Sequence, residues 1–153
     1  MTLAEQHLLT EFTVLGRPQQ KGSKRSVWRP RKGGGINIYQ VDANEKAKPW
    51  QRAVQLAAYE ASGGAVLYGP VMVTLRFYFP RPRGHYGTGS NAQRLRASAP
   101  LEMTTMPDID KLVRTALDGL TGALIGDDRQ VVQVLARKSY DEPERLEVAV
   151  MTL

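Results

Sequence analysis

The 153-residue sequence contains no cysteine, which excludes disulfide bonds and any zinc or iron–sulfur site with cysteine ligands. It has only two histidines, His7 and His85, so a histidine-rich metal site or a histidine-centred hydrolase is poorly supported. No apolar run reaches membrane-spanning length, and residues 1–11 have neither a basic start nor a long apolar core. The sequence therefore predicts a cytoplasmic protein without a membrane partner.

Acidic residues are outnumbered by basic ones, with 15 Asp and Glu against 21 Lys and Arg and a formal net charge of +6. Such a balance favours polyanionic partners without identifying them. Hydrophobic residues make up 42% of the chain, and the length suits one domain with a sizeable core. No internal repeat is visible. These bulk properties do not identify a reaction or a binding site, which have to be inferred from local motifs.

The most informative stretch runs from Thr104 to Lys138, with Asp108-Ile109-Asp110 at its centre. Pro107 favours a helix entry directly after it, and Gly119 and Gly122 are expected to supply the C-terminal stop. The apolar residues between recur at the spacing of one buried helix face: Ile109, Leu112, Val113, Ala116, Leu117 and Leu120. The pattern predicts a helix that begins at Ile109.

Asp108 and Asp110 straddle this change from extended chain to helix. Residues two apart share a face in extended chain but point to nearly opposite sides of a helix, so the two carboxylates converge only if Asp108 is pre-helical. Helix N-termini also favour carboxylates through their free N–H groups and the macrodipole. The pair therefore has two readings, as ligands for a cation or as ordinary capping residues.

A second acidic pair, Asp127-Asp128, follows a short turn and precedes an apolar, β-branched run that begins at Val131. If the helix and this strand pack antiparallel with the strand start displaced, Asp128 meets Asp108 and Asp110. Three carboxylates would then form an all-oxygen site suited to Mg²⁺ or Mn²⁺. The alternative for Asp127-Asp128 alone is a solvated turn.

Taken in order, these residues resemble the signature of the RusA-type Holliday-junction resolvases, small endodeoxyribonucleases of bacteria and their phages or prophages. The matching residues are Pro107-Asp108-Ile109-Asp110, Leu112, Arg114, Asp118-Gly119-Leu120, Asp127-Asp128-Arg129-Gln130-Val131-Val132 and Lys138. The likeness is strong over roughly a quarter of the chain, and the ordered combination is specific where any single piece is weak. It extends more weakly from Gly16-Arg17-Pro18 to Lys24-Arg25.

The resemblance implies that Asp108, Asp110 and Asp128 bind Mg²⁺, with Mn²⁺ as a substitute, and that Asp127 lies beside them. These four aspartates and Arg114 are the expected catalytic residues. The family commonly has Asn after the second aspartate and Lys four residues after it, whereas this sequence has Lys111 and Arg114 there. Arginine keeps the charge but not the shape or titratability of lysine, which puts a lysine-specific catalytic role in doubt.

Basic residues also gather in two stretches that are expected to be loops. From Arg17 to Lys32 there are seven basic residues and no acidic one, interrupted by Gly and Pro, and Trp28 among them could stack on an unpaired base. A solvated basic loop is the alternative. Beside a carboxylate site, phosphate binding is the better interpretation, and the expected DNA-binding residues are Lys21, Lys24, Arg25, Arg29, Arg31, Lys32, Lys111, Arg114 and Lys138.

The remaining patterns predict one α+β domain over residues 1–153, with a small mixed or antiparallel sheet, two main helices and the order β-β-α-β-α-β-β. A helix is expected from Pro49 to Ser62, and mobile basic loops at about 17–35 and 81–106. Strands are expected at Glu11–Leu15, Ile36–Val41, Val71–Phe79, Val131–Tyr140 and Leu146–Val150. The last two are expected to pair with each other in antiparallel fashion.

Together with these patterns, the resemblance implies a Mg²⁺-dependent, structure-selective endodeoxyribonuclease that resolves four-way DNA junctions by paired phosphodiester hydrolysis in recombination and repair. Bound Mg²⁺ would activate a water and offset charge on the scissile phosphate. Arg114 would contact phosphate or, alternatively, pair with Asp110 and Asp118. One carboxylate cluster per chain serves one strand, so a two-fold homodimer is expected.

Three other functions compete with this prediction. The first is a basic nucleic-acid-binding module in which the aspartates only cap and solvate. The second is a nuclease of the Pro-Asp…(Asp/Glu)-x-Lys type, which is disfavoured because Ala136-Arg137-Lys138 has no acid two residues before the lysine. The third is an interaction protein whose charge only aids solubility, against which the two basic stretches argue weakly.

Overall fold

A four-stranded sheet forms the body of the protein, and the computed structural model describes residues 7–153. Its strands are β1 (Leu9–Leu15), β4 (Val71–Phe79), β5 (Val131–Tyr140) and β6 (Arg145–Thr152), in the order β1-β6-β4-β5. β4 and β5 are parallel, and the other neighbours are antiparallel. β4 is an interior strand between β6 and β5, and its alternate residues are fully or almost fully buried: Val71, Val73, Leu75, Phe77 and Phe79.

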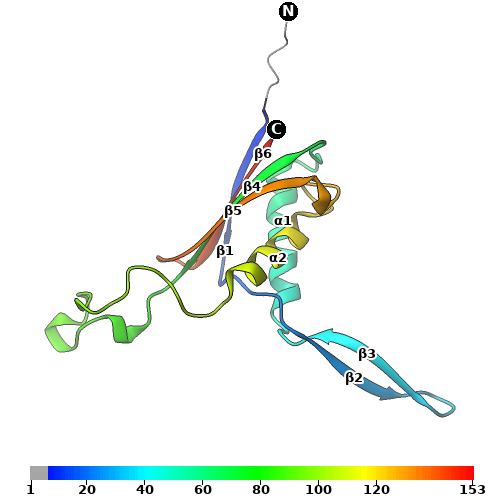
Figure 1. The fold of residues 1–153 in the computed structure, drawn as a ribbon, viewed down its shortest axis with the longest axis horizontal. Helices are drawn as coiled ribbons and strands as arrows, with labels where there is room; N and C mark the ends of the chain where they lie inside the picture. The colour runs from blue at the N-terminus through cyan, green and yellow to red at the C-terminus, as the bar shows by residue number, and fades with distance from the viewer. Residues whose placement is uncertain (1–6) are drawn as a thin grey trace, which may run out of the picture.

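Two helices, α1 (Ala47–Ser62) and α2 (Ile109–Leu120), cover one face of this sheet (Figure 1). Each presents an apolar stripe to the core, as the helical spacing predicts. The buried members are Trp50, Val54 and Ala58 of α1 and Leu112, Ala116 and Leu120 of α2. No helix within residues 7–153 is long and apolar enough to cross a membrane.

Two extensions leave the body at the end where α2 begins (Figure 1). One is the β2–β3 arm, a two-stranded antiparallel ribbon of β2 (Lys24–Pro30) and β3 (Ile36–Asp42). The other, residues 80–107, is mostly irregular and contains two short 3₁₀ turns, η1 (Arg83–His85) and η2 (Gly89–Asn91). Both extensions carry the basic stretches that the sequence placed in loops.

The predicted α+β class is confirmed, as are the positions of both helices and of the interior strand β4. α2 begins at Ile109 and ends at Leu120, and β4 spans Val71–Phe79. α1 begins at Ala47 rather than Pro49, which is consistent because proline is tolerated in the first turn of a helix.

The irregular structure expected across residues 17–35 is wrong for its second half, where β2 forms. The cause is pairing across the ribbon, in which Val27 lies opposite Tyr39 and Trp28 opposite Ile38. Aromatic and β-branched cross-strand pairs of this kind stabilise a sheet even where basic residues interrupt the alternation.

The predicted antiparallel pair of the last two strands is also wrong, because β4 lies between β5 and β6. Leu75 of β4 is opposite Ala136 on one side and Val148 on the other. Parallel strands need a crossover connection, and α2 supplies it between β4 and β5. β6 then occupies the remaining side of β4.

Gly119 does not end α2 as expected but lies inside it, packed against α1. A Cβ atom at this position would lie 2.8 Å from Cβ of Val54 and 2.9 Å from the Gln51 carbonyl oxygen of α1. The turn glycine Gly122, with φ at 85°, follows the helix. The absence of a side chain at Gly119 therefore sets the distance between α1 and α2.

We expect Gly119→Ala to lower the free energy of unfolding by about 1–3 kcal/mol, the usual cost of overpacking. Alanine gains up to about 1 kcal/mol of helix propensity, but the atoms it meets are a backbone oxygen and a Cβ, which cannot swing away. Urea unfolding measures the change. Gly84→Ala, whose added Cβ meets nothing within 4 Å, is the control, and equal stability of the two variants would contradict this packing.

Candidate functional site

At the start of α2, Asp108 precedes the helix and Asp110 lies within it, as the two carboxylates need in order to converge. Asp108 is still extended, with φ −73° and ψ 132°, and Asp110 lies in the first helical turn. The Asp108 N–H donates a hydrogen bond of 2.7 Å to the Gln20 side-chain oxygen, and its carboxylate pairs with Lys111 Nζ at 3.2 Å. Asp110 is exposed and takes part in none of the ion pairs within residues 7–153.

Lys138 of β5 fixes the segment that enters this helix. Its ammonium group donates to the carbonyl oxygens of Thr105 at 2.6 Å and Pro107 at 2.9 Å. Lys138 is among the residues expected from the sequence to bind DNA, and that role stays a prediction. In the structure, its charge holds the chain just before Asp108 against the end of β5.

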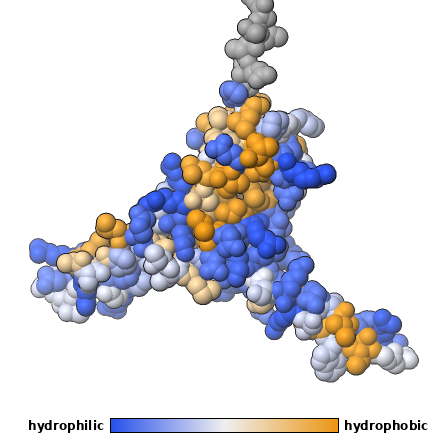
Figure 2. Space-filling view, viewed as in Figure 1, coloured by the Kyte–Doolittle hydropathy of each residue, from blue (hydrophilic) through white to orange (hydrophobic). Residues whose placement is uncertain are grey.

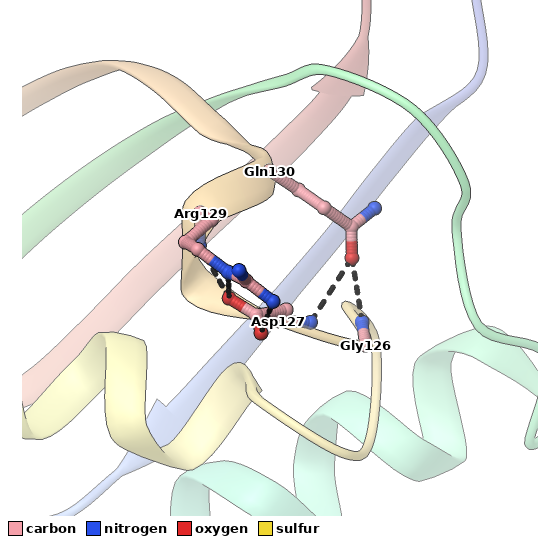
Figure 3. Close-up of polar contacts among 4 residues, drawn as sticks. All are labelled: Gly126, Asp127, Arg129 and Gln130. Atoms are coloured by element: carbon pink, nitrogen blue, oxygen red, sulfur yellow. Dashed lines mark hydrogen bonds and ion pairs between the residues drawn. The ribbon is translucent and has the colours of Figure 1, made fainter.

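Asp127 begins the 3₁₀ turn η3 (Asp128–Gln130) and is bound on both carboxylate oxygens by Arg129 (Figure 3). Arg129 Nε donates to one oxygen at 3.0 Å and a terminal nitrogen donates to the other at 2.9 Å. The hydrogen bonds from the side chain and backbone of Arg129 lower the Asp127 pKa from 3.8 to about 2. Asp127 is thus ionised and its carboxylate is occupied by hydrogen bonds within the turn, whereas Asp128 is exposed.

Gln130 ties the same turn to the sheet. Its side-chain oxygen accepts hydrogen bonds from the N–H groups of Gly126, at 2.8 Å, and Asp127, at 3.1 Å (Figure 3). Its amide nitrogen donates to the carbonyl oxygens of Leu67 and Gly69, both at 3.0 Å. The position of Asp128 is therefore set by contacts on both sides of it.

The structure does not bring Asp108, Asp110 and Asp128 together within one chain. α2 has 12 residues, which at 1.5 Å per residue separates its ends by about 18 Å, and the second acidic pair follows its far end. β5 then runs back, so that Lys138 rather than Asp128 reaches Pro107. Across residues 7–153 there is no group of three or more Asp, Glu or His residues placed to hold a metal ion.

The strand start is not displaced toward the helix N-terminus because the intervening turn is tight. The N–H groups of Leu124 and Ile125 both donate to the Leu120 carbonyl oxygen, and Thr121 forms a bridge with Ile125. These contacts keep the chain beside the C-terminal end of α2 until η3 begins.

Arg114 is exposed on α2 and does not pair with the acids considered for it. Asp118 is bound instead by Lys21, whose Nζ lies 2.8 Å away, and no ion pair in the described part of the chain includes Arg114. The backbone N–H of Lys21 also donates to the Lys111 carbonyl oxygen. Lys21 thus fastens the segment before the β2–β3 arm along α2.

The other basic residues predicted to bind DNA lie on the β2–β3 arm: Lys24, Arg25, Arg29, Arg31 and Lys32. Arg25 lies 3.9 Å from Glu45, Arg29 stacks over the Tyr39 ring at 5.8 Å, and Arg31 donates to the Asn37 side chain. These exposed contacts leave the guanidinium groups at the surface. On the other extension, His85 of η1 packs edge-on against Tyr140, with the ring centroids 5.3 Å apart.

Two glutamines with positioning roles were missed by sequence reasoning. Gln130 stands three residues after Asp127, which is the spacing of a capping box, and the structure contains that box. The sequence therefore contained a pattern from which the contact of Gln130 with Asp127 could have been predicted. Nothing in the pattern around Gln20 indicates that it would accept a hydrogen bond from a residue 88 positions later.

Comparison with known proteins gives two matches. A protein-family model described as endodeoxyribonuclease RusA matches residues 17–151. The chain is also 32% identical over 145 residues to the uncharacterized protein YqaN of Bacillus subtilis strain 168, across 92% of this chain and 94% of that protein.

We expect Lys138→Met to loosen the extension that precedes α2, because two carbonyl oxygens lose their donor. Limited trypsin digestion should then cut residues 81–106 several-fold faster than in the unmodified protein. Lys48→Met, which removes the same charge from the exposed start of α1, is the control. Equal digestion rates for the two variants would show that Lys138 does not restrain this segment.

We expect Arg129→Ala to raise the Asp127 pKa from about 2 toward 3.8, because the Arg129 side-chain hydrogen bond is the largest cause of the lowered pKa. Because the Asp127 pKa is lower in the folded chain than in the unfolded chain, the ionised carboxylate stabilises the fold at pH values above the unfolded pKa. This contribution is lost as pH falls from about 4 through about 2. Carboxyl-carbon NMR titration gives the pKa directly. Arg137→Ala, which removes an exposed guanidinium paired with Glu102, should leave it unchanged.

Proposed function

The chain belongs to the RusA family of endodeoxyribonucleases, and we propose that it resolves four-way DNA junctions in a Mg²⁺-dependent reaction. The supporting observation is that each end of α2 carries a pair of carboxylates with one exposed member outside every ion pair described: Asp110 at the start and Asp128 after the end. Since the named relative is bacterial and the proposed substrate is DNA, we place the enzyme in the cytoplasm.

The donor set fits a hard cation, because Asp108, Asp110 and Asp128 offer only carboxylate oxygens. These three residues would hold Mg²⁺, with Mn²⁺ as a substitute. When bound, the ion supplies a water of lowered pKa and offsets charge on the scissile phosphate. Arg114 lies one turn beyond Asp110 on the same helix face. Its guanidinium, which forms no ion pair within residues 7–153, would contact a phosphate there, and Asp127 would keep Asp128 in place.

A second copy of the chain is needed to bring the acidic pairs together, and β5 is the edge at which it would bind. β5 is the last strand of the sheet, and Val132, Val134 and Leu135 on it are 62%, 40% and 63% exposed. Figure 2 shows hydrophobic residues exposed over the body as well as on the β2–β3 arm. A long apolar edge strand is a template for pairing with another chain.

Antiparallel pairing of β5 with its own copy about a two-fold axis would place the start of one strand opposite the end of the other. Asp128 stands just before the start of β5. Near the end of β5, Lys138 holds Pro107, and Asp108 and Asp110 follow. Each site would therefore take Asp108 and Asp110 from one chain and Asp128 from the other, giving two sites for two strands.

The second candidate is a basic DNA-binding module without catalysis. It is favoured by the capping and turn contacts of Asp127 and by the separation of the carboxylates in one chain. Incubating a labelled four-way junction with Mg²⁺, and separately with EDTA, distinguishes the two functions. Matched, moderate salt is needed because phosphate contacts alone depend steeply on ionic strength.

We expect Asp110→Asn and Asp128→Asn each to abolish Mg²⁺-dependent junction cleavage, with folding and DNA affinity nearly unchanged. Mixing the two inactive variants should restore nicking to about a quarter of the wild-type rate, because half of the dimers are mixed and each mixed dimer has one intact site. A gel assay that separates nicked from fully resolved junctions measures this.

The control is a mixture of Asp108→Asn with Asp110→Asn, which leaves no intact site in any dimer. Cleavage by Asp110→Asn alone at the wild-type rate would rule out the site. Restored nicking only in the Asp110→Asn plus Asp128→Asn mixture supports the shared site. The shared site would be contradicted if the two inactive variants stayed inactive when mixed. It would also be contradicted if the protein cleaved junctions under conditions in which sedimentation shows a monomer.

A further inference from the structure

The β2–β3 arm has two faces of different chemistry. Because residues paired across an antiparallel ribbon point to the same side, the register assigns each residue to a face. Trp28 with Ile38, and Pro30 with Ile36, share one face. Arg29 with Asn37, and Arg25 with Val41, share the other.

The apolar face is uncovered. Trp28 is 67% exposed, Ile38 73% and Ile36 59%, and Figure 2 shows this hydrophobic group on the arm away from the body. An isolated two-stranded ribbon is marginally stable in water, and exposed apolar groups of this kind mark interaction sites. The face therefore suits an occupant from outside the chain.

The charge of the arm identifies the chemistry of that occupant. From Lys24 to Val41 there is no acidic residue, and five basic residues fall in this range. Arg29 stacks on Tyr39 on the face opposite Trp28, and Arg31 is directed to the same face through its hydrogen bond to Asn37. A partner that offers phosphates to one side and planar apolar rings to the other is a nucleic acid with unstacked bases.

The base of the arm is fastened to the segment that positions Asp108. The N–H groups of Gly22 and Asn44 both donate to Asp42, at 2.9 and 2.8 Å. The Asn44 side chain donates to the Gln20 carbonyl oxygen at 2.8 Å, and the Gln20 side chain accepts from the Asp108 N–H. The arm thus has a defined place relative to the start of α2.

We propose that the Trp28–Ile38 face of the arm is a wedge that stacks on unpaired bases at the branch point of a DNA junction, while the opposite basic face contacts the backbone. The proposal rests on the proposed function, since it assigns the selectivity for branched DNA to the arm. Apolar side chains inserted at opened base steps are a known way for proteins to bind distorted DNA.

The test is DNA binding in EDTA, where cleavage does not interfere, by fluorescence anisotropy at matched salt. Trp28→Ala should weaken binding of a four-way junction about 5- to 150-fold, the range that follows from losing one base–aromatic stack. Binding of linear duplex should be unchanged, since it offers no unstacked base. Trp28→Phe should retain most junction affinity, and Tyr59→Ala, an exposed aromatic of α1, should have no effect.

A second measurement uses 2-aminopurine placed at the branch point. The unmodified protein should change its fluorescence on binding, and Trp28→Ala should not. Equal loss of junction and duplex binding in Trp28→Ala would overturn the wedge, as would unchanged junction binding. Conversion of a dimer to a monomer by Trp28→Ala would also overturn it, by showing that a second copy covers this face. Junction cleavage by the unmodified protein in Mg²⁺ tests the proposed function separately.

Discussion

The direction and length of α2 determine where every acidic side chain of the site lies. The helix is held against α1 by the close contact of Gly119 with Val54, and the chain enters and leaves it next to an aspartate pair. Because 12 helical residues span about 18 Å, those pairs stay apart in one chain. The crossover from β4 to β5 requires this helix, so the separation follows from the topology of the sheet.

Each acidic pair contains one carboxylate that the fold uses and one that it leaves exposed. Asp108 is paired with Lys111 and Asp127 with Arg129, so these carboxylates are partly compensated. Asp110 and Asp128 are exposed. Bringing them together would be opposed by their like charges, and a divalent cation removes this opposition. In the proposed shared site, assembly of two chains and binding of the ion would therefore favour one another.

Local patterns of the sequence predicted what depends on local interactions. The helical spacing from Ile109 to Leu120 and the alternation from Val71 to Phe79 both appear in the structure with the same bounds. The extended Asp108, expected as the condition for convergence of the two carboxylates, also depends on neighbouring residues. The partner of β5 was not predicted, because strand order depends on packing between segments distant in sequence. The role of Gln20 was not predicted for the same reason, because its contact with Asp108 joins residues 88 positions apart.

In the proposed wedge, the two faces of the arm would separate affinity from selectivity. Lysine and arginine bound to phosphates hold any DNA, and their contribution falls steeply as salt rises. They carry no information about whether a helix is continuous or branched. Stacking on a base requires that the base has already left its neighbours, so the exposed Trp28 beside Ile38 would respond to the opened structure itself. Because Gln20 joins the arm to Asp108, recognition on the arm would fix the distance between the branch point and the carboxylates.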